Sequence, residues 1–115
     1  MSPAVLVRFY RTEMGREPVI DWLRNECSRD ERIEYGATLR QVQDTWPQGR
    51  PLVGAFGGGL FEVICEGPAP VRSARMLFCF EHGVLLVLHA FFKKSQKTPK
   101  AAIDVARTRM KTLNP

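Results

Sequence analysis

The sequence predicts a small α/β protein of the α+β class, in which an antiparallel-rich sheet of about four strands carries two N-terminal helices and a C-terminal helix. Two stretches before residue 47 repeat their apolar residues every three or four positions, as helices with one buried face do. Three β-rich runs follow one another after residue 59 with short turns between them, which favours antiparallel pairing. A length of 115 residues, 44% hydrophobic and 25% charged, is typical of a single domain, here residues 1–115. The predicted order is β-α-α-β-β-β-α, with the two early helices stacked on one face of the sheet.

The N-terminal half is predicted to contain one strand and then two helices. Residues 4–10 (AVLVRFY) are β-rich and predict the first strand. Pro18 suits the first turn of a helix, because its missing N–H has no partner there in any case. Asp30 is expected to cap a second helix, which should end before Pro47.

The C-terminal half is predicted to be rich in strands. Residues 47–59 contain two prolines and five glycines and are expected to form a loop. Strands are expected at 60–66, 73–80 and 84–92. The last two are apolar at both alternating positions, so both sheet faces should be covered, the second by the terminal helix or by a partner protein. Thr98 is expected to cap that helix, with Pro99 at its first position.

The charge of the chain is strongly asymmetric, because all five lysines lie in its last 23 residues. Residues 1–89 carry ten Arg against eleven Asp and Glu, a net charge of −1. Residues 90–115 carry five Lys and two Arg against one Asp, a net charge of +6. A local positive potential of this kind concentrates and steers polyanions. The expected partner is therefore the phosphate backbone of a nucleic acid.

The sequence gives no support for several other classes of protein. The first residues lack an apolar core long enough for a signal peptide, and no run approaches the roughly 18 residues that span a bilayer. We therefore expect a cytoplasmic protein with no membrane partner. Cys27, Cys65 and Cys79 form no C-x-x-C pair, and the two histidines lack a ligand spacing. Buried reduced thiols, no metal site and no cofactor are expected.

The main candidate for chemistry is the segment LHAFFKKSQKTP, residues 88–99. A hydrophobic strand there ends in aromatic residues and leads directly into Lys93, Lys94 and Lys97. Cations held in fixed positions stabilise a developing charge best, and exposed aromatic rings can stack on bases. The competing interpretation is a solvated basic loop that keeps a strand end soluble. His89 lies inside the strand, where a packed core or groove histidine is favoured over a general base.

The same segment resembles the RelE/ParE superfamily of type II toxins, in particular its HigB-like, phage-associated branch. GGLFEVI (58–64), ARMLFCF (74–80) and EPVIDWL (17–23) fit the family pattern in the same order. The resemblance implies a RelE-like fold and a toxin that enters the ribosomal A site and cleaves mRNA. It also implies restraint by a cognate antitoxin, for which a helix-turn-helix protein is the expected type.

The resemblance also implies roles for individual residues. Arg75 matches the family's phosphate-binding arginine, the three lysines 93, 94 and 97 match its basic motif, and Glu62 matches its acidic strand residue. For Glu62 a structural ion pair with a neighbouring arginine is equally supported. Ile64 stands where the family usually has an arginine, so either Arg72 supplies that charge or the site is weaker. The substrate-binding candidates are therefore Glu62, Arg72, His89 and Phe92.

A mechanism follows from these residue types. RNA carries its own nucleophile, the 2′-OH, so the protein must orient it, move its proton and stabilise the phosphorane. Arg75 would clamp phosphate oxygens, Lys93 or Lys94 would stabilise the transition state, and Lys97 is the candidate for proton exchange. The residue types alone do not divide these roles among the lysines. The alternatives are a ParE-like poison of DNA gyrase and a nucleic-acid-binding module without catalysis.

Overall fold

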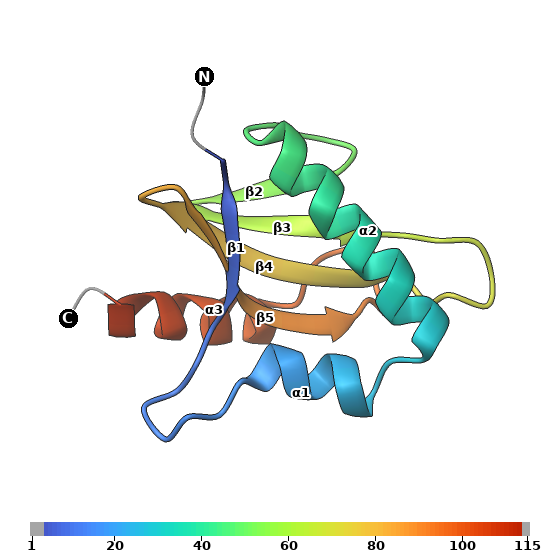
Figure 1. Cartoon of the computed structure of the whole chain (residues 1–115), viewed down its shortest axis with the longest axis horizontal. Helices are drawn as coiled ribbons and strands as arrows, with labels where there is room; N and C mark the ends of the chain where they lie inside the picture. The colour runs from blue at the N-terminus through green and yellow to red at the C-terminus, as the bar shows by residue number, and fades with distance from the viewer. Residues whose placement is uncertain (1–3, 114–115) are drawn as a thin grey trace.

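The computed structural model describes residues 4–113, and it confirms a mixed α/β fold of the predicted α+β class (Figure 1). Its helices and strands are β1 (Leu6–Phe9), α1 (Pro18–Asn25), α2 (Arg29–Thr45), β2 (Val53–Gly57), β3 (Leu60–Cys65), β4 (Ala74–Glu81), β5 (Val84–Phe92) and α3 (Lys100–Leu113). The five strands form one sheet in the order β1-β5-β4-β3-β2. None of the helices in this part of the chain is long and apolar enough to cross a membrane.

The sheet has a fifth strand, β2, inside the stretch that was predicted to be a loop. Val53 pairs with Val63 and Gly54 with Glu62 in an antiparallel register, which shifts at a bulge between Ala55 and Gly57. Pairing with β3 therefore overrides the poor strand propensity of the glycines. The turn that follows needs its glycines, because residues 57, 58 and 59 all have positive φ angles.

The sheet is rich in antiparallel pairs, as predicted, but β1 joins it in parallel. This strand pairs in parallel with β5, with Leu6 opposite Val84 and Phe9 opposite Val87. The chain reaches β5 only after both early helices and the three other strands, so no short turn restricts the direction of the pair. The β4–β5 hairpin is as predicted, with His82 and Gly83 in the left-handed region at its turn.

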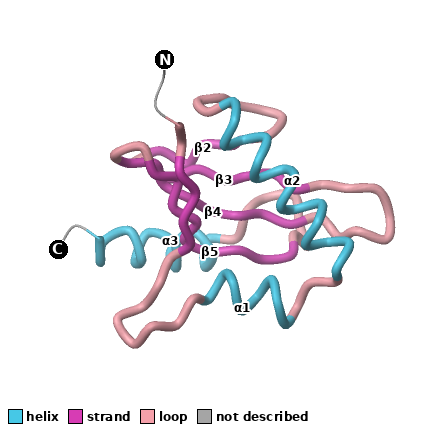
Figure 2. Tube along the Cα trace, viewed as in Figure 1, coloured by secondary structure: helices cyan, strands magenta, loops and turns pink. Residues whose placement is uncertain are grey.

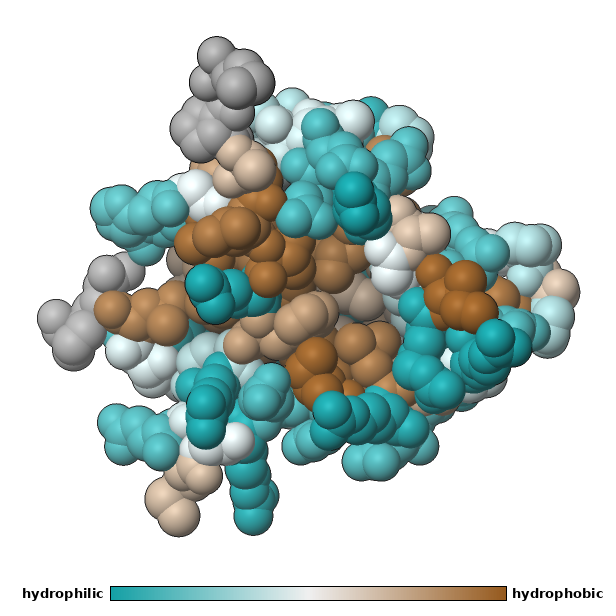
Figure 3. Space-filling model, in the orientation of Figure 1, coloured by the Kyte–Doolittle hydropathy of each residue, from teal (hydrophilic) through white to brown (hydrophobic). Residues whose placement is uncertain are grey.

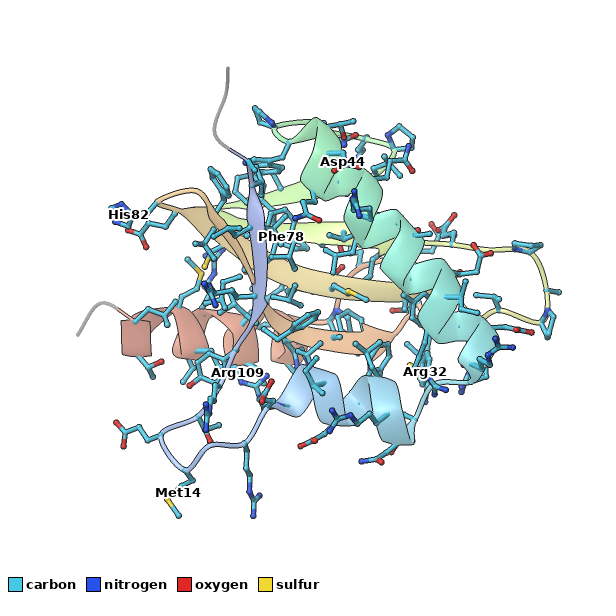
Figure 4. The ribbon with its side chains drawn as sticks, viewed as in Figure 1. Met14, Arg32, Asp44, Phe78, His82 and Arg109 are labelled. Atoms are coloured by element: carbon cyan, nitrogen blue, oxygen red, sulfur yellow. The ribbon has the colours of Figure 1, made fainter. Side chains whose placement is uncertain are left out.

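Helices cover both faces of the sheet, as the two-sided apolar pattern of β4 and β5 predicted (Figure 2). The larger core lies under α1 and α2, where Trp46 packs edge-on against Phe78 with ring centroids 5.2 Å apart. Figure 4 labels Phe78, which belongs to β4. The smaller core lies under α3, where Ala106 packs with Leu77 and Leu88. In Figure 3 polar residues cover the outer sides of α1 and α2, and apolar residues are visible between the helices and along β1.

Cys27, Cys65 and Cys79 are buried free thiols, as expected, and burial raises the pKa of Cys65 to about 12.

The second helix starts at a different residue from the one predicted. Ser28, not Asp30, is its N-cap. The Ser28 hydroxyl accepts a hydrogen bond from the Glu31 backbone N–H at 3.1 Å, and the Glu31 carboxylate accepts one from the Ser28 N–H at 2.9 Å. This reciprocal capping box satisfies two N–H groups that the first turn of a helix otherwise leaves unpaired.

Glu31 also joins α2 to the segment before β4. Its buried carboxylate accepts hydrogen bonds from Arg72 Nε and Nη2, both at 2.8 Å, and from the Arg72 backbone N–H at 3.0 Å. The hydrogen bonds from Arg72 hold the pKa of Glu31 well below its usual range. Unfolding returns the carboxyl to its ordinary pKa, so the unfolded chain takes up a proton in acid before the folded one does. The stability that this pair contributes is therefore full above about pH 4.5 and is lost as the pH falls below that.

Replacing Glu31 by Gln is expected to lower the free energy of unfolding at pH 7 by about 2 kcal/mol. It should also reduce the fall in melting temperature between pH 6 and pH 3. Thermal melts at the two pH values measure both effects. Asp44→Asn is the matched control. Asp44 is exposed, and its only ion pair among residues 4–113 is with Arg40 one turn away, so the change should cost less than about 0.5 kcal/mol. A Glu31→Gln protein with the same pH profile as the wild type would contradict the prediction.

Candidate active site

The candidate site lies on the α3 face of the sheet, beyond the part that the helix covers. Side chains alternate between the faces of a strand, so Glu62 and Ile64 of β3 share one face. Arg75 of β4 pairs with Ile64 and lies on that same face. The segment 93–99 runs from the end of β5 to the start of α3, and it forms a second wall over these strands.

Two adjoining hollows make up the site. The inner pocket, of about 290 Å³, is lined by Arg50, Phe56, Glu62, Ile64, Arg75, Lys93, Gln96, Lys97 and Thr98. The outer groove, of about 570 Å³, is lined by Arg50, Glu66, Ser73, Arg75, Lys93, Lys94, Ser95 and Gln96. They share Arg50, Arg75, Lys93 and Gln96. A larger hollow between β1 and the end of α2 contains none of the predicted site residues.

Arg75 is the most unusual residue of the site, because its guanidinium is buried with only 6% of the side chain exposed. Its Nη1 donates to the Ala74 carbonyl at 2.9 Å, and its Nη2 donates to Glu66 at 3.3 Å. Its Nε lies 3.7 Å from Glu62 Oε1, too far for a good hydrogen bond, and has no hydrogen-bond partner among the described residues. A buried N–H donor without a partner is costly. Arg75 lines both hollows, so an anion there would lie near its positive charge.

Glu62 is the buried carboxylate of the same pocket. Its Oε1 accepts a hydrogen bond of 2.7 Å from the Thr98 hydroxyl. Thr98 was predicted to cap α3, but its hydroxyl is committed to Glu62. The Pro99 carbonyl accepts the first helical bonds, from the N–H groups of Ala102 and Ile103, so Pro99 stands before the helix and not in its first turn. Thr98 thus connects the start of α3 to the acidic residue of the site.

Gly54 leaves room for Glu62. These two residues pair across β2 and β3, and a Cβ added at Gly54 would lie 2.9 Å from Glu62 Oε2 and 3.2 Å from its Cγ. A Cβ atom does not come within 3.0 Å of an oxygen atom to which it is not bonded, so the buried Glu62 side chain would have to shift. The position of the Glu62 carboxylate relative to Thr98 and Arg75 therefore depends on the absence of a side chain at residue 54.

Replacing Gly54 by Ala is expected to lower the activity of the site by about tenfold while the protein stays folded, because it displaces Glu62 by a few tenths of an ångström or more. Gly36→Ala is the matched control: Gly36 lies in α2 with open space around it, so this change should raise stability by about 0.5–1 kcal/mol and leave activity unchanged. The measurements are the activity assay described below and a thermal melt. Full activity in Gly54→Ala would contradict the proposed positioning of Glu62.

The structure separates the three lysines of the basic motif. Lys93 lines both hollows, with its backbone N–H bonded to the Ser73 carbonyl at 2.9 Å and its Nζ bonded to the Gln96 carbonyl at 2.6 Å. Lys97 is exposed and lines only the inner pocket, beside Glu62. Lys94 is exposed and lines only the outer groove.

The structure does not bring Arg72 and Phe92 into either hollow. Both lie on the opposite face, where the Arg72 guanidinium stacks on the Phe92 ring 3.7 Å from its centroid. Phe92 also packs against Trp22 and belongs to the larger core, and Arg72 is bound to Glu31. Arg72 therefore does not supply to the pocket the positive charge that an arginine at position 64 would provide. Lys93 follows Phe92 directly, and the alternation of side chains along the strand puts the two on opposite faces.

His89 is on the α3 face but lines neither hollow. Its ring stacks on Phe91 with the centroids 5.8 Å apart. Burial, and then the nearby guanidinium of Arg109 on α3, lower the pKa of His89 to about 4 (Figure 4). The imidazole is therefore neutral at pH 7, in keeping with a packed histidine.

Sequence reasoning missed Arg50, which lines both hollows. Arg50 lies between Gly49 and Pro51 in the stretch predicted to be a loop, and nothing in its neighbours indicates a site. It comes to the pocket because β2, which begins three residues later, pairs with β3. Arg50 could have been identified only by first predicting the β2 strand, because the pairing of that strand with β3 places Arg50 at the pocket.

The comparisons with known proteins address the family. Comparison with curated proteins gave no match. The family model described as phage-derived protein Gp49-like (DUF891) matches residues 21–111, which include β2 to β5 and every residue of the two hollows. This stretch is well over half of the chain. The chain therefore belongs to the Gp49-like family of phage-derived proteins, a toxin-like family of the RelE group.

Proposed function

We propose that this protein is the toxin of a type II toxin–antitoxin pair of the HigB-like branch, and that it cleaves mRNA on the ribosome. The observation that carries the proposal is the buried Arg75 guanidinium, which lines the same pocket as Glu62 and whose Nε–H has no hydrogen-bond partner among the described residues. The cationic residues Arg50, Lys93 and Lys97 line the same pocket. Membership of a toxin-like family supports the same function.

The proposed reaction is a transfer within the RNA itself. The 2′-oxygen attacks the adjacent phosphorus, the P–O2′ bond forms and the P–O5′ bond breaks. The 2′-OH gives up its proton and the leaving 5′-oxygen gains one, so the products are a 2′,3′-cyclic phosphate and a 5′-hydroxyl. The protein supplies no nucleophile, and it contributes orientation, proton transfer and stabilisation of the phosphorane.

The positions of the side chains suggest how the work is divided. Arg75 and Lys93 line both hollows, and their guanidinium and ammonium groups would stabilise the non-bridging oxygens. Lys97, beside Glu62 in the inner pocket, would exchange the protons. Lys94, in the outer groove, would hold a neighbouring phosphate of the strand.

The partners follow from this activity. The substrate is mRNA in the ribosomal A site, and the restraining partner is a cognate antitoxin, for which we propose a helix-turn-helix protein. All would meet in the cytoplasm. The net charge of +6 on residues 90–115 supports binding to an RNA-rich surface, because a dense positive patch attracts phosphates over several ångströms.

Primer extension on a defined mRNA in a reconstituted translation system, with and without ribosomes, tests the proposal. The expected result is a set of cuts within the A-site codon that require ribosomes. Intact mRNA with normal translation would contradict it, and a supercoiling assay would then test for a gyrase poison. RNA binding without cleavage would indicate a nucleic-acid-binding module.

A further inference from the structure

We infer that Arg50 is a second phosphate-binding arginine of this site, and that it supplies from the α2–β2 loop the guanidinium that β3 lacks at Ile64. The inference rests on the proposed function and names a contact that the substrate makes. It follows from where Arg50 lies, from the absence of a carboxylate partner for it, and from the apolar character of position 64.

Arg50 is placed to reach a substrate in either hollow. It lines the inner pocket and the outer groove, and with Arg75, Lys93 and Gln96 it forms the part of the wall that they share. Its side chain is exposed, and among residues 4–113 no carboxylate lies within 4.0 Å of its charged nitrogens. The guanidinium of Arg50 is thus available to an anion.

The guanidinium also lies beside the acidic residue of the pocket. Arg50 Nη2 is 3.5 Å from the point where a Cβ on Gly54 would sit, and Glu62 Oε2 is 2.9 Å from the same point. The two groups therefore flank the bare backbone of Gly54 without forming an ion pair. Thr98 and Arg75 occupy the other side of the Glu62 carboxylate.

Position 64 is the other place from which a second arginine can line the inner pocket, but it lies next to Arg75. Ile64 lies directly across from Arg75 in the β3–β4 pair, and like charges at such a position repel. With isoleucine there, the buried Arg75 has an apolar neighbour, while a second guanidinium enters from the β2 side. Two guanidiniums on different walls can donate to different non-bridging oxygens of one phosphate, which a single planar fork cannot do as well.

The test compares Arg50→Ala and Arg50→Lys with the wild type in the ribosome assay, with rates measured over a range of toxin concentrations. Arg50→Ala should lower kcat/KM by about 10- to 100-fold, the effect expected for lost hydrogen bonds to a charged group, with an unchanged melting temperature. Arg50→Lys should recover only part of the loss, because an ammonium lacks the forked geometry. Arg40→Ala, an exposed arginine of α2 paired with Asp44, is the matched control and should cleave normally.

A rescue experiment tests the link to position 64. Ile64→Arg introduced into the Arg50→Ala protein should raise kcat/KM at least tenfold above the value for Arg50→Ala alone. A folded double variant that stays as weak as Arg50→Ala would overturn the claim that Arg50 replaces an arginine at residue 64. Normal cleavage by Arg50→Ala itself would overturn the whole inference while leaving the proposed function intact.

A binding assay keeps the inference testable if the wild type does not cleave. The probe is a fluorescent RNA oligonucleotide with 2′-deoxy sugars, which cannot undergo the reaction, and the readout is anisotropy at fixed salt. Binding by the wild type that weakens about tenfold in Arg50→Ala, but not in Arg40→Ala, would support the contact even where the nuclease proposal fails. A wild type that neither cleaves nor binds this probe would overturn both.

Discussion

Replacing Arg75 by Lys is expected to leave the protein folded and to lower the rate of mRNA cleavage on the ribosome by about 100- to 1,000-fold. Lysine keeps the charge, but it lacks the planar guanidinium through which Arg75 bonds the Ala74 carbonyl and Glu66 and still has a third N–H group without a partner among the described residues. The rate should be measured with toxin in excess over ribosomes, so that the chemical step and not product release is observed.

Arg72→Lys is the matched control for Arg75→Lys. Arg72 makes the same kind of ion pair, but on the opposite face, with Glu31. This change should lower the melting temperature and leave the cleavage rate within about threefold of the wild type. If Arg72→Lys lost cleavage and Arg75→Lys kept it, the phosphate would bind on the opposite face of the sheet from the site that we propose.

Replacing Lys97 by Ala is expected to lower the cleavage rate by about 100-fold or more, the usual contribution of a positioned proton-transfer group. Lys94→Ala should lower it by less than about tenfold at low salt, because Lys94 lines only the outer groove. The double replacement should abolish translation arrest without unfolding the protein, since both side chains are exposed.

Rates measured at several salt concentrations separate the two lysines. The Lys94→Ala defect should be a loss of affinity that follows the salt dependence of phosphate contacts, whereas the Lys97→Ala defect should persist at saturating toxin. Equal defects with the same salt dependence in the two variants would contradict the division of roles between the hollows.

Much of the fold could be predicted because its signals are local. The first helix begins at Pro18, and β5 spans residues 84–92, both as the sequence predicted. The capping box can also be predicted from the sequence, because Ser28 and Glu31 have the S-x-x-E spacing of that motif. The prediction of Asp30 as the N-cap is wrong. The β2 strand was missed because its five residues, two of them glycine, owe their structure to pairing with β3. The parallel direction of β1 depends on a partner almost 80 residues away, which no local pattern reports.

The sequence by itself determined the chemical character of this protein: a cluster of lysines after an apolar strand, an arginine on the preceding strand, and a family pattern that a matching family model supports at the level of the Gp49-like family. Only the tertiary structure decided which of these groups meet. Alternation along β5 turns Phe92 to the core and away from the site, and Glu31, 41 residues before Arg72, holds that arginine on the other face. Pairing of β2 with β3 brings Arg50 to the pocket. Residue types are local properties, whereas the face on which a side chain lies depends on strand register and on partners far away in the chain.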